Sequence, residues 1–384
     1  MQSFSSLLAQ ILNIIPRGQF AELVAEHQSE RHARGFTSWQ QLVSMLFCHL
    51  GRAQSLREIE YGLRSASGKL NHLGVDAPSR STLSYANAHR TWRLFETLFY
   101  VVLERCRSAQ PGKHRMRFKN PLFSIDSTTV ELVSEMYSWA KYNKTKGAIK
   151  LHLMLDHDGY LPSYALVTDG KSADITVGRT FQFDPGSVVV FDRGYIDYAW
   201  FRTLMERGVW FVTRLKKNAH FTVVETRKPP KGVISDQVVD VTDARRTARG
   251  GFVPLRLRRV EVDDQKGGIL VIYSNHLTFG ATTISRIYKE RWQIELFFKA
   301  LKQNLKIKTF IGTSMNAIQI QLWTALIAIL IIRYLKLKSA TAVSLSNLIA
   351  MLRFHLFAYR ELWSWLQSPF ESLSPPSPVQ LSLI

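Results

Sequence analysis

The stretch Thr282–Leu305 carries polar and ionisable side chains at a spacing that could do chemistry. Its apolar periodicity predicts one helix, and at about 100° per residue Tyr288, Arg291, Glu295 and Lys302 share a narrow stripe. The stripe runs beside the apolar face, where an ionisable group without a partner is costly. A row of this kind indicates a site that faces a polyanion or a metal ion.

The same helix has a simpler interpretation, in which it lies on the surface and its charges pair with one another. Glu295 is one turn from both Arg291 and Lys299, the spacing at which opposite charges stabilise a helix. Trp292 is also open to two interpretations: packing in the core, or stacking on an unpaired base.

Two further carboxylates, Asp126 and Asp192, each belong to an apolar stretch that reads as a strand. The first stretch is Phe118–Val130, and the second, Val188–Asp192, is a β-branched run of the kind buried on both faces of a sheet. Between them, Lys150–Val167 predicts a hairpin around an Asp-Gly turn. Asp126 could instead accept hydrogen bonds from following amides in a capped turn. A catalytic site is therefore predicted from Asp126, Asp192 and Glu295 in this order, and not from any one of them alone.

The spacing Tyr-x2-Arg-x3-Glu-x6-Lys resembles the signature of the insertion sequence four family of bacterial transposases. Those are DDE enzymes with a ribonuclease-H-like core, in which one Asp lies on the central strand and the next just beyond its neighbour. Asp126 and Asp192 match these two positions. The resemblance implies that Glu295 is the third catalytic carboxylate. It also implies contacts to the phosphates of transposon ends from the other signature residues, Tyr288, Arg291 and Lys302.

Three carboxylates suit phosphodiester cleavage, which requires an activated nucleophile and neutralised phosphate charge. Two Mg²⁺ ions about 3.5–4 Å apart supply both, and Mg²⁺ prefers carboxylate oxygens. We expect Asp126 to bridge the two ions, because a central strand is the most rigid support, with Asp192 and Glu295 each holding one ion. Mn²⁺ is the expected substitute. His152, on the hairpin, is interpreted as a core histidine and not as a ligand.

The 384-residue chain has a formal net charge of +20 and a pI near 10. A protein this basic usually meets a polyanion, either nucleic acid or an anionic membrane surface. Cys48 and Cys106 are far apart, which argues against a disulfide framework or a zinc site and fits a reducing cytoplasm. No signal peptide is evident. The most apolar run, Leu322–Ile332, is shorter than a membrane span and is expected in a buried helix, Ala317–Leu335, packed on the sheet.

Composition and pattern divide this α/β chain into parts. We expect a helical DNA-binding domain over residues 1–110, the first part of a ribonuclease-H-like catalytic core over 111–208, a β-rich insertion over 209–280, the second part of the core with C-terminal helices over 281–367, and a flexible tail over 368–384. The insertion is expected because 102 residues separate Asp192 from Glu295, more than a bare core needs.

The amino-terminal helices include a pattern that could read DNA. A predicted helix at Leu56–Leu63 is followed by a glycine-containing turn and then by a long helix from Ser79 to Arg105, with Arg80 near its start. This order suggests helix-turn-helix binding, although a plain structural bundle has the same pattern. Residues 1–110 hold 12 Lys and Arg against 8 Asp and Glu, so most of the excess positive charge lies later.

Positive charge is dense in the expected insertion and after Glu295. In Leu255-Arg256-Leu257-Arg258 the arginines alternate with leucines, so both are expected on the face away from the core. Such a surface could simply aid solubility, but its density beside three carboxylates favours contact with phosphates. The candidate DNA contacts outside the signature residues are Trp292, Lys299, Arg80, Arg214, Lys216, Lys217, Arg256 and Arg258.

Together these observations predict a cut-and-paste DNA transposase. It would bind the terminal inverted repeats of an insertion sequence, cut the DNA with divalent metal and join the 3′-OH ends to target DNA. The expected partners are double-stranded DNA, as transposon end and as target, and a second copy of the chain in the DNA complex, with no membrane. Two alternatives are a transposase remnant that binds DNA without catalysis and a nuclease that cuts without joining. The expected location is the bacterial cytoplasm, with the chromosome.

Overall fold

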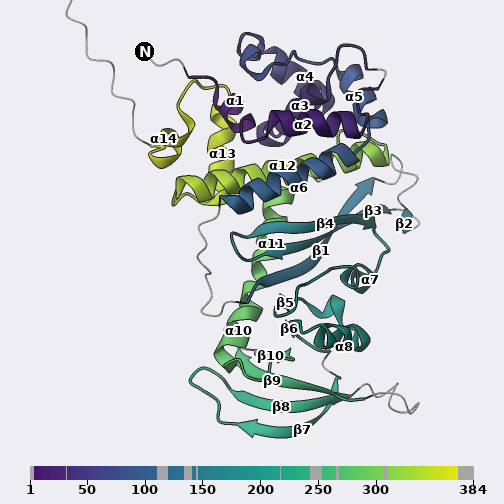
Figure 1. The fold of residues 1–384 in the computed structure, drawn as a ribbon, viewed down its shortest axis with the longest axis vertical. Helices are drawn as coiled ribbons and strands as arrows, with labels where there is room; N and C mark the ends of the chain where they lie inside the picture. The colour runs from purple at the N-terminus through teal and green to yellow at the C-terminus, as the bar shows by residue number, and fades with distance from the viewer. Residues whose placement is uncertain are drawn as a thin grey trace, which may run out of the picture.

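The computed structural model describes residues 4–31, 33–109, 120–133, 141–143, 146–216, 218–242, 253–264, 268–305 and 310–370. Helices from both ends of the chain form a layer above a large mixed sheet, which extends away from them along the longest axis (Figure 1). The α/β class expected from the sequence is therefore confirmed. Most of the expected tail, residues 371–384, lies outside the described residues.

The amino-terminal region folds as short helices around buried leucines. α3 begins with a capping box, because the Thr37 hydroxyl accepts from the Gln40 amide and the Gln40 side chain accepts from the Thr37 amide. The single long helix expected from Ser79 to Arg105 is wrong: the backbone turns extended at Arg90, with ψ of 140°. The described helices here are α1 (Leu7–Leu12), α2 (Arg17–Glu26), α3 (Ser38–Gly51), α4 (Leu56–Arg64), α5 (Arg80–His89) and α6 (Arg93–Ser108).

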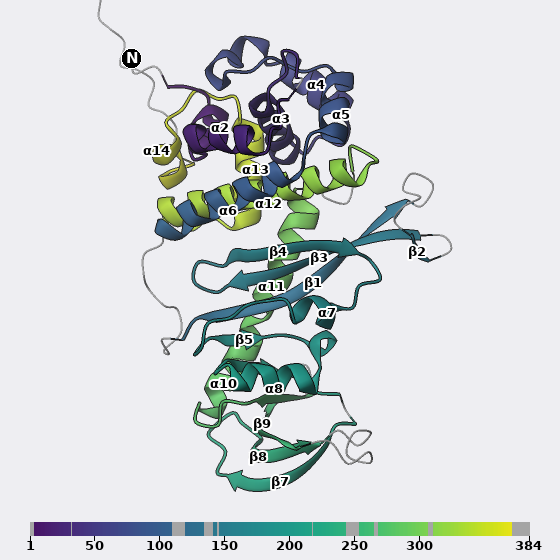
Figure 2. The same ribbon diagram turned by 45° about the vertical axis from the view of Figure 1, so that its right-hand side comes forward.

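One mixed sheet runs through the rest of the molecule, with strand order β2-β3-β1-β5-β6-β10-β9-β8-β7 and β4 paired with β3 (Figure 2). β1 is antiparallel to β3 and parallel to β5, and β3 with β4 forms the expected hairpin. The strands are β1 (Leu122–Val133), β2 (Lys141–Asn143), β3 (Lys146–Asp156), β4 (Leu161–Asp169), β5 (Val188–Val190), β6 (Trp210–Thr213), β7 (His220–Arg227), β8 (Ser235–Thr242), β9 (Leu255–Asp263) and β10 (Ile269–Ser274).

The boundary expected at residue 209 does not separate two sheets. β6 pairs in parallel with β5, so it continues the part of the sheet that contains β1. β10 then pairs with the other edge of β6 in the antiparallel sense, and β9, β8 and β7 follow. The β-rich segment therefore extends the same sheet, because β6 offers it a free edge.

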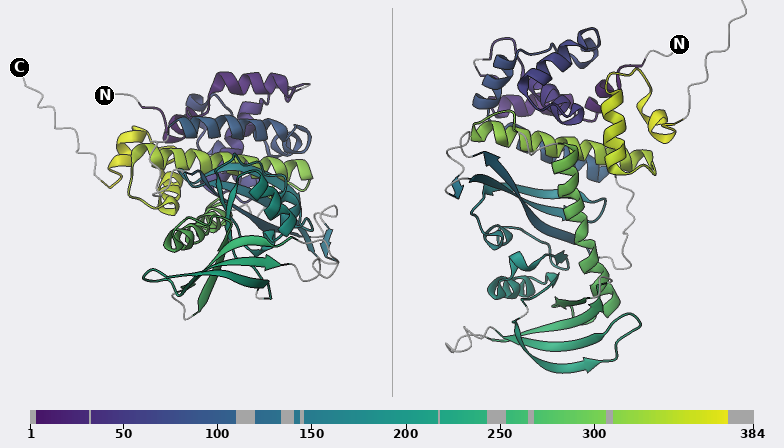
Figure 3. Two further views of the ribbon diagram at one scale, coloured as in Figure 1. Left: turned by 60° about the horizontal axis from the view of Figure 1, so that its bottom comes forward. Right: turned by 180° about the vertical axis from the view of Figure 1, so that it is seen from behind.

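Helices cover both faces of the sheet. α10 (Ala281–Glu290) and α11 (Trp292–Lys299) run along one face toward α12, as Figure 3 shows from behind. α7 (Asp174–Gly178) and α8 (Tyr198–Glu206) lie on the other face. Side chains alternate along β5 accordingly, since Val190 packs with the α10 cluster while Val189 packs with the α8 cluster.

The long apolar helix α12 (Met315–Ser339) is enclosed by other helices. By length and composition it could cross a membrane, but 89% of its apolar window is buried within the protein. It packs mainly on α6 and α3, and its main contact with the sheet is at β4, so the expected packing on the sheet is only a minor part of its environment. A helix that is apolar on all sides needs cover all round, and α13 (Leu345–His355) supplies another part of it. α14 (Leu362–Gln367) ends the described helices.

Candidate active site

Asp126 in β1 and Asp192 just after β5 occupy equivalent positions along these two neighbouring parallel strands. The paired register of β1 and β5 ends with Ser124 opposite Val190, and each carboxylate follows two residues later. The backbone at Asp192 is still extended, with φ of −89° and ψ of −173°. Because side chains alternate along extended chain, both carboxylates lie on the face that α10 and α11 cover.

Local hydrogen bonds hold each of these two carboxylates. Asp126 Oδ1 accepts from the Ser127 amide at 2.8 Å, within β1, so the alternative of a capped turn is wrong. Asp192 Oδ1 accepts from the Gly194 amide at 2.8 Å and begins the 3₁₀ turn Arg193–Tyr195. One Oδ1 acceptor role on each side chain is therefore taken by backbone.

Glu295 is carried by α11, which continues α10 after a change in hydrogen bonding. The Arg291 amide donates to Tyr288 O, and the Ile294 amide donates to Arg291 O, both at 3.2 Å and both across three residues. After Lys299 the chain forms a π-helical turn, Ala300–Asn304. The single regular helix expected over Thr282–Leu305 is thus wrong in detail, and helical irregularities of this type are frequent at functional sites.

Arg291 and Glu295 form an ion pair beside these carboxylates. Arg291 Nη2 lies 2.6 Å from Glu295 Oε1, and the two side chains are 16% and 31% exposed. The guanidinium also lies 5.7 Å from the ring centroid of Tyr288, which is buried. Burial lowers the pKa of Arg291, but the neighbouring Tyr288, Glu295 and Asp126 outweigh it and the net shift is upward. Arg291 therefore stays charged inside the site.

The pKa of Asp126 shows that the three carboxylates share one electrostatic environment. Burial is the largest cause of its rise to about 7, and the charges of Asp192 and Glu295 add to it. The Ser127 amide and Arg291 oppose the rise. Among the described residues, however, no three His, Cys, Asp or Glu side chains come close enough to hold one metal ion. The predicted convergence within metal-bridging reach is not observed, since Glu295 pairs with Arg291.

The remaining residues of the helix fall into different environments. Lys302 Nζ donates to Thr129 O at 2.7 Å and so ties the π-helical turn to β1. Trp292 is 56% exposed, which makes the core-packing interpretation wrong. Lys299 is exposed as well. The outer side of α11 thus presents an aromatic ring and a positive charge to solvent.

The two arginines of β9 differ in burial. Arg256 is half exposed and pairs with Asp240 at 2.8 Å. Arg258 is 5% exposed, its Nε lies 2.5 Å from Asp236 Oδ1, and its Nη1 donates to Leu277 O. The expectation that both arginines lie on an exposed face is wrong for Arg258, because the segment after β10 covers it. Arg258 is a structural residue in this fold.

The other candidate DNA contacts lie apart from one another. Arg80 is exposed at the start of α5, which lies against α4, and its amide donates to Glu60 Oε2 at 3.0 Å. Lys216 is exposed and Arg214 is half-buried, both just after β6. Lys217 lies outside the described residues.

A fourth carboxylate, Asp174, was missed by the sequence analysis. It opens α7 and accepts from Ser127 Oγ at 2.6 Å and from Lys150 Nζ at 3.1 Å. A Cβ at Gly194 would lie 3.0 Å from Asp192 Oδ1 and 3.1 Å from Asp174 Oδ2, so these carboxylates flank the Gly194 backbone. The available signal was weaker than that for Asp192: Asp174 follows the predicted hairpin after a turn, whereas Asp192 directly ends an apolar run.

His152 is a buried member of the same neighbourhood. Its Nε2 is 2.9 Å from Thr168 Oγ1, and its Nδ1 is 3.9 Å from Asp174. Its pKa is lowered to about 4, mainly by burial; Asp174 opposes this shift and Lys150 contributes to it. The ring is therefore neutral at physiological pH.

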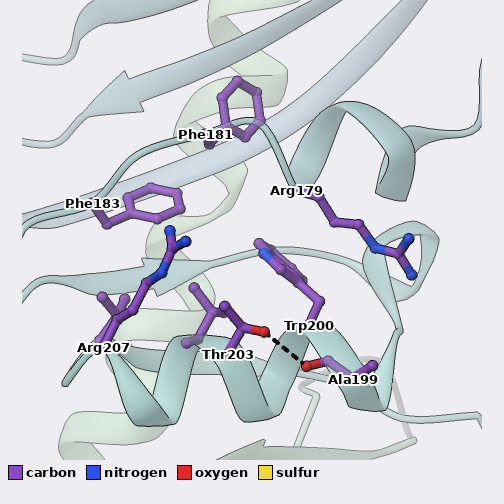
Figure 4. Close-up of a pocket in the computed structure, with 9 residues that line it drawn as sticks. Arg179, Phe181, Phe183, Ala199, Trp200, Thr203 and Arg207 are labelled. Atoms are coloured by element: carbon purple, nitrogen blue, oxygen red, sulfur yellow. Dashed lines mark hydrogen bonds between the residues drawn. The ribbon is translucent and has the colours of Figure 1, made fainter.

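A hollow of about 320 Å³ lies against α8, away from the carboxylates (Figure 4). Its polar groups already have partners. Arg179 pairs with Asp197 at 2.7 Å, and the Thr203 hydroxyl donates to Ala199 O at 3.2 Å. Phe181 and Phe183 form much of the rest of its wall. We therefore do not include it in the candidate site.

Comparisons with known proteins fit this arrangement. A family profile described as "Transposase DDE domain" matches residues 117–331, and one described as "Domain of unknown function (DUF4372)" matches residues 3–76. The chain is 34% identical over 263 residues to a putative transposase, y4zB, of Sinorhizobium fredii, covering 67% of this chain and 71% of the relative. It is 29% identical over 282 residues to the probable transposase for insertion sequence element IS5377 of Geobacillus stearothermophilus, covering 71% and 72%.

A third relative is a putative transposase for insertion sequence element IS4SA of Synechocystis, 27% identical over 289 residues, with 73% of this chain and 78% of the relative covered. Among solved structures, the piggyBac transposase synaptic complex with hairpin DNA is similar with a TM-score of 0.44 and 11% identity, over 98% of this chain and 84% of that chain. The first profile spans more than half of the sequence and the relatives are named as transposases, so this chain belongs to the transposase DDE domain family.

Proposed function

We propose that this protein binds the terminal inverted repeats of an insertion sequence, cuts the DNA at those ends and joins the 3′-OH groups to target DNA. Membership of a transposase family makes DNA the partner. One observation carries the finer proposal: Asp126 and Asp192 stand level on parallel strands, and Glu295 acts on the pKa of Asp126 from the helix above them.

The topology supports a ribonuclease-H-like catalytic core. Strands β4-β3-β1-β5-β6 follow the order expected of that fold, with β1 in the centre and its parallel neighbours on one side. In this proposal the core includes β6, the β-rich insertion comprises β7 to β10, and the core resumes with α10 and α11. The helices of residues 4–109 would form the DNA-binding domain.

The family implies divalent metal ions, and the donor types of the site suit them, provided that Glu295 exchanges its ion pair with Arg291 for the metal. Asp126, Asp192 and Glu295 offer the carboxylate oxygens that Mg²⁺ prefers. Burial is the main cause of the raised pKa of Asp126, and the charges of Asp192 and Glu295 add to it; a bound cation would favour the ionised carboxylate. These three residues would hold two Mg²⁺ ions, with Mn²⁺ as a substitute, and the ions would neutralise phosphate charge and activate the nucleophile.

The protein's own groups would position the DNA strand. Arg291 can bind a phosphate through two N–H groups, and the buried Tyr288 ring supports its guanidinium from below. Lys302 adds positive charge where the π-helical turn meets β1. The Ser127 amide holds the Asp126 carboxylate toward the site. Each of these contacts restricts the position of the scissile bond, which small displacements would impair.

Side chains outside the carboxylate cluster, all exposed except the half-buried Arg214, would contact the DNA farther out. Trp292 can stack on a base, and the basic contacts we retain are Lys299, Arg214, Lys216, Arg256 and Arg80. Because an element has two ends, we propose that two copies of the chain act in one DNA complex. The protein would work in the bacterial cytoplasm, where its DNA is.

The test is cleavage and strand transfer by purified protein on DNA that carries the element's own ends, with Mg²⁺. Asp126→Ala should abolish both reactions while end binding stays within a few-fold of wild type. Asp184→Ala, which removes an exposed carboxylate, is the matched control and should retain both. Cleavage without joining would identify a nuclease, binding without cleavage a remnant, and normal cleavage by Asp126→Ala would refute the assignment.

A further inference from the structure

A second pocket lies beside α11. It has a volume of about 700 Å³ and is bounded by the turn between β3 and β4, by α11, by the end of α12 and by the start of α13. This size falls within the usual range for ligand sites. Three basic side chains and one acidic side chain are among its lining residues: Lys299, Arg333, Lys336 and Asp158.

Arg333 lines this pocket without an ionic partner. Its guanidinium lies 5.3 Å from the ring centroid of Phe297, and its Nε atom is inaccessible and has no hydrogen-bond acceptor. Within the described part of the chain no carboxylate pairs with it. Burial lowers the pKa of Arg333 to about 10, so it is still charged at neutral pH. A charged group withdrawn from water without a counter-ion is costly, and such costs are usually met by a ligand or partner.

The start of α13 supplies a second feature that favours an anion. This helix has 11 residues, and Ser344, Leu345 and Ser346 at its beginning line the pocket. Ser344 caps it by accepting from the Asn347 amide at 3.2 Å. The first amides of a helix and its dipole attract negative charge. Arg333 and this helix end belong to different elements, so they are independent observations that point to the same ligand charge.

The pocket and the candidate active site share helix α11. Lys299, which lines it, follows Glu295 by four residues, so the two lie within about 40° and about 6 Å along the helix. Trp292, on the same helix, is exposed as well. A DNA strand that reaches Glu295 could therefore continue past Lys299 into the pocket.

We propose that this pocket binds a backbone phosphate of the DNA, with Arg333 and Lys336 as the contacting cations and the start of α13 as a further anion-binding group. The proposal rests on the proposed function and identifies a contact outside the Tyr-Arg-Glu-Lys signature. A backbone phosphodiester carries one negative charge, and the three basic side chains and one acidic side chain of the lining leave a net positive charge that attracts it. Asp158 would favour a diester over a more highly charged free phosphate.

The experiment is a salt titration of binding to labelled duplex that carries the element's end, by fluorescence anisotropy. Each lost phosphate contact should reduce the steepness of the log–log salt slope by about 0.9. Arg333→Gln and Lys336→Gln should each do so, and the double variant should lose about twice as much. Lys338→Gln removes an exposed charge from the same helix outside the pocket and should leave the slope unchanged.

A second measurement separates loss of contact from loss of fold. Thermal unfolding of each variant, with and without inorganic phosphate at constant ionic strength, reports folding and free-anion binding. Arg333→Lys keeps the positive charge and should keep most of the salt slope. If Arg333 served only to pack on Phe297, the lysine variant would lose thermal stability as Arg333→Gln does, and its salt slope would equal that of wild type. Equal slopes for Arg333→Gln, Lys336→Gln and Lys338→Gln would overturn the proposal.

The outcomes also separate this inference from the proposed function. If binding by the wild-type protein hardly depends on salt, the protein does not neutralise DNA phosphates and the proposed function itself is refuted. If wild-type protein binds and cleaves DNA but the pocket variants match Lys338→Gln, only the pocket proposal fails. If inorganic phosphate stabilises the wild type through Arg333 and the DNA slope does not change, the pocket binds a free anion and the DNA contact is refuted.

Discussion

Arg291 and Glu295 form a 2.6 Å ion pair one helical turn apart, and both act on the pKa of the buried Asp126. A surface pair at this spacing would contribute little because water and salt screen it. This pair is instead mostly withdrawn from solvent, with Arg291 only 16% exposed. Arg291 therefore binds the Glu295 carboxylate in this structure, and in the proposed DNA complex it would bind a phosphate at the same position.

The first prediction concerns Arg291. Arg291→Ala should lower cleavage on the order of 100-fold, because loss of a positioning contact misplaces the scissile bond. Lys289→Ala, whose side chain is exposed on the same helix, should cleave like wild type. Single-turnover cleavage with Mg²⁺ and saturating end DNA measures the difference. If both variants cleave at the wild-type rate, the stripe does not face the DNA.

The second prediction concerns Gly194. A Cβ there would lie 3.0 Å from Asp192 Oδ1 and 3.1 Å from Asp174 Oδ2, tighter than most contacts of this kind, so Gly194→Ala should shift Asp192 by a few tenths of an ångström. We expect a loss of cleavage on the order of 10- to 100-fold with end binding retained. Gly18→Ala is the control, because a Cβ at Gly18 meets nothing within 4 Å. Unchanged cleavage by Gly194→Ala would mean that Asp192 need not hold its present position.

How far the sequence predicted this site depended on the type of signal. Asp126 and Asp192 were identified because each belongs to an apolar stretch that reads as a strand, and because their order with Glu295 matches the resemblance carried by the Tyr-Arg-Glu-Lys spacing. Asp174 was missed because its contacts to Ser127 and Lys150 come from three separate elements that no spacing connects. The spacing of residues along one helix or strand predicts which of them share a face, but it does not predict contacts between different elements.

The same limit explains the errors in the fold. Alternation correctly put Arg256 and Arg258 on one side of β9, but burial of Arg258 depends on Leu277 and on Asp236 from a different strand. β6 was assigned to the insertion because it lies in the long β-rich stretch between Asp192 and Glu295. Only the pairing of β6 with β5 reveals its place in the sheet.

The third prediction uses those two arginines as a matched pair. Arg258→Ala leaves the Asp236 carboxylate buried without a partner, and loss of one member of a buried pair costs about 3–5 kcal/mol of unfolding free energy. Arg256→Ala breaks an exposed pair on the same strand and should change stability little. Urea unfolding measures both. Equal losses would show that the pair at Arg258 is not held in a low-dielectric environment.

The fourth prediction concerns pH and the junction between α3 and α12. His49 is fully buried, its Nε2 lies 2.9 Å from Thr324 Oγ1, and burial lowers its pKa to about 4. The unfolded chain has a His pKa of about 6.5, so between these values the unfolded state binds the proton more readily. The stabilising contribution is therefore complete above about pH 6.5 and is lost as the pH falls toward 4. For a shift of this size the loss amounts to roughly 3 kcal/mol at most.

The measurement is the free energy of unfolding of wild type and His49→Gln between pH 8 and pH 4. Because Gln cannot take up the proton, the variant should lose less stability over that interval, although it starts lower at pH 8 for want of the imidazole packing. His72→Gln, which removes an exposed histidine from the same helical region, should follow the wild-type curve. Parallel curves for wild type and His49→Gln would show that His49 is protonated in the folded protein or that another buried group controls the acid transition. His152, also held near a pKa of 4 by burial, is the first alternative to test in the same way.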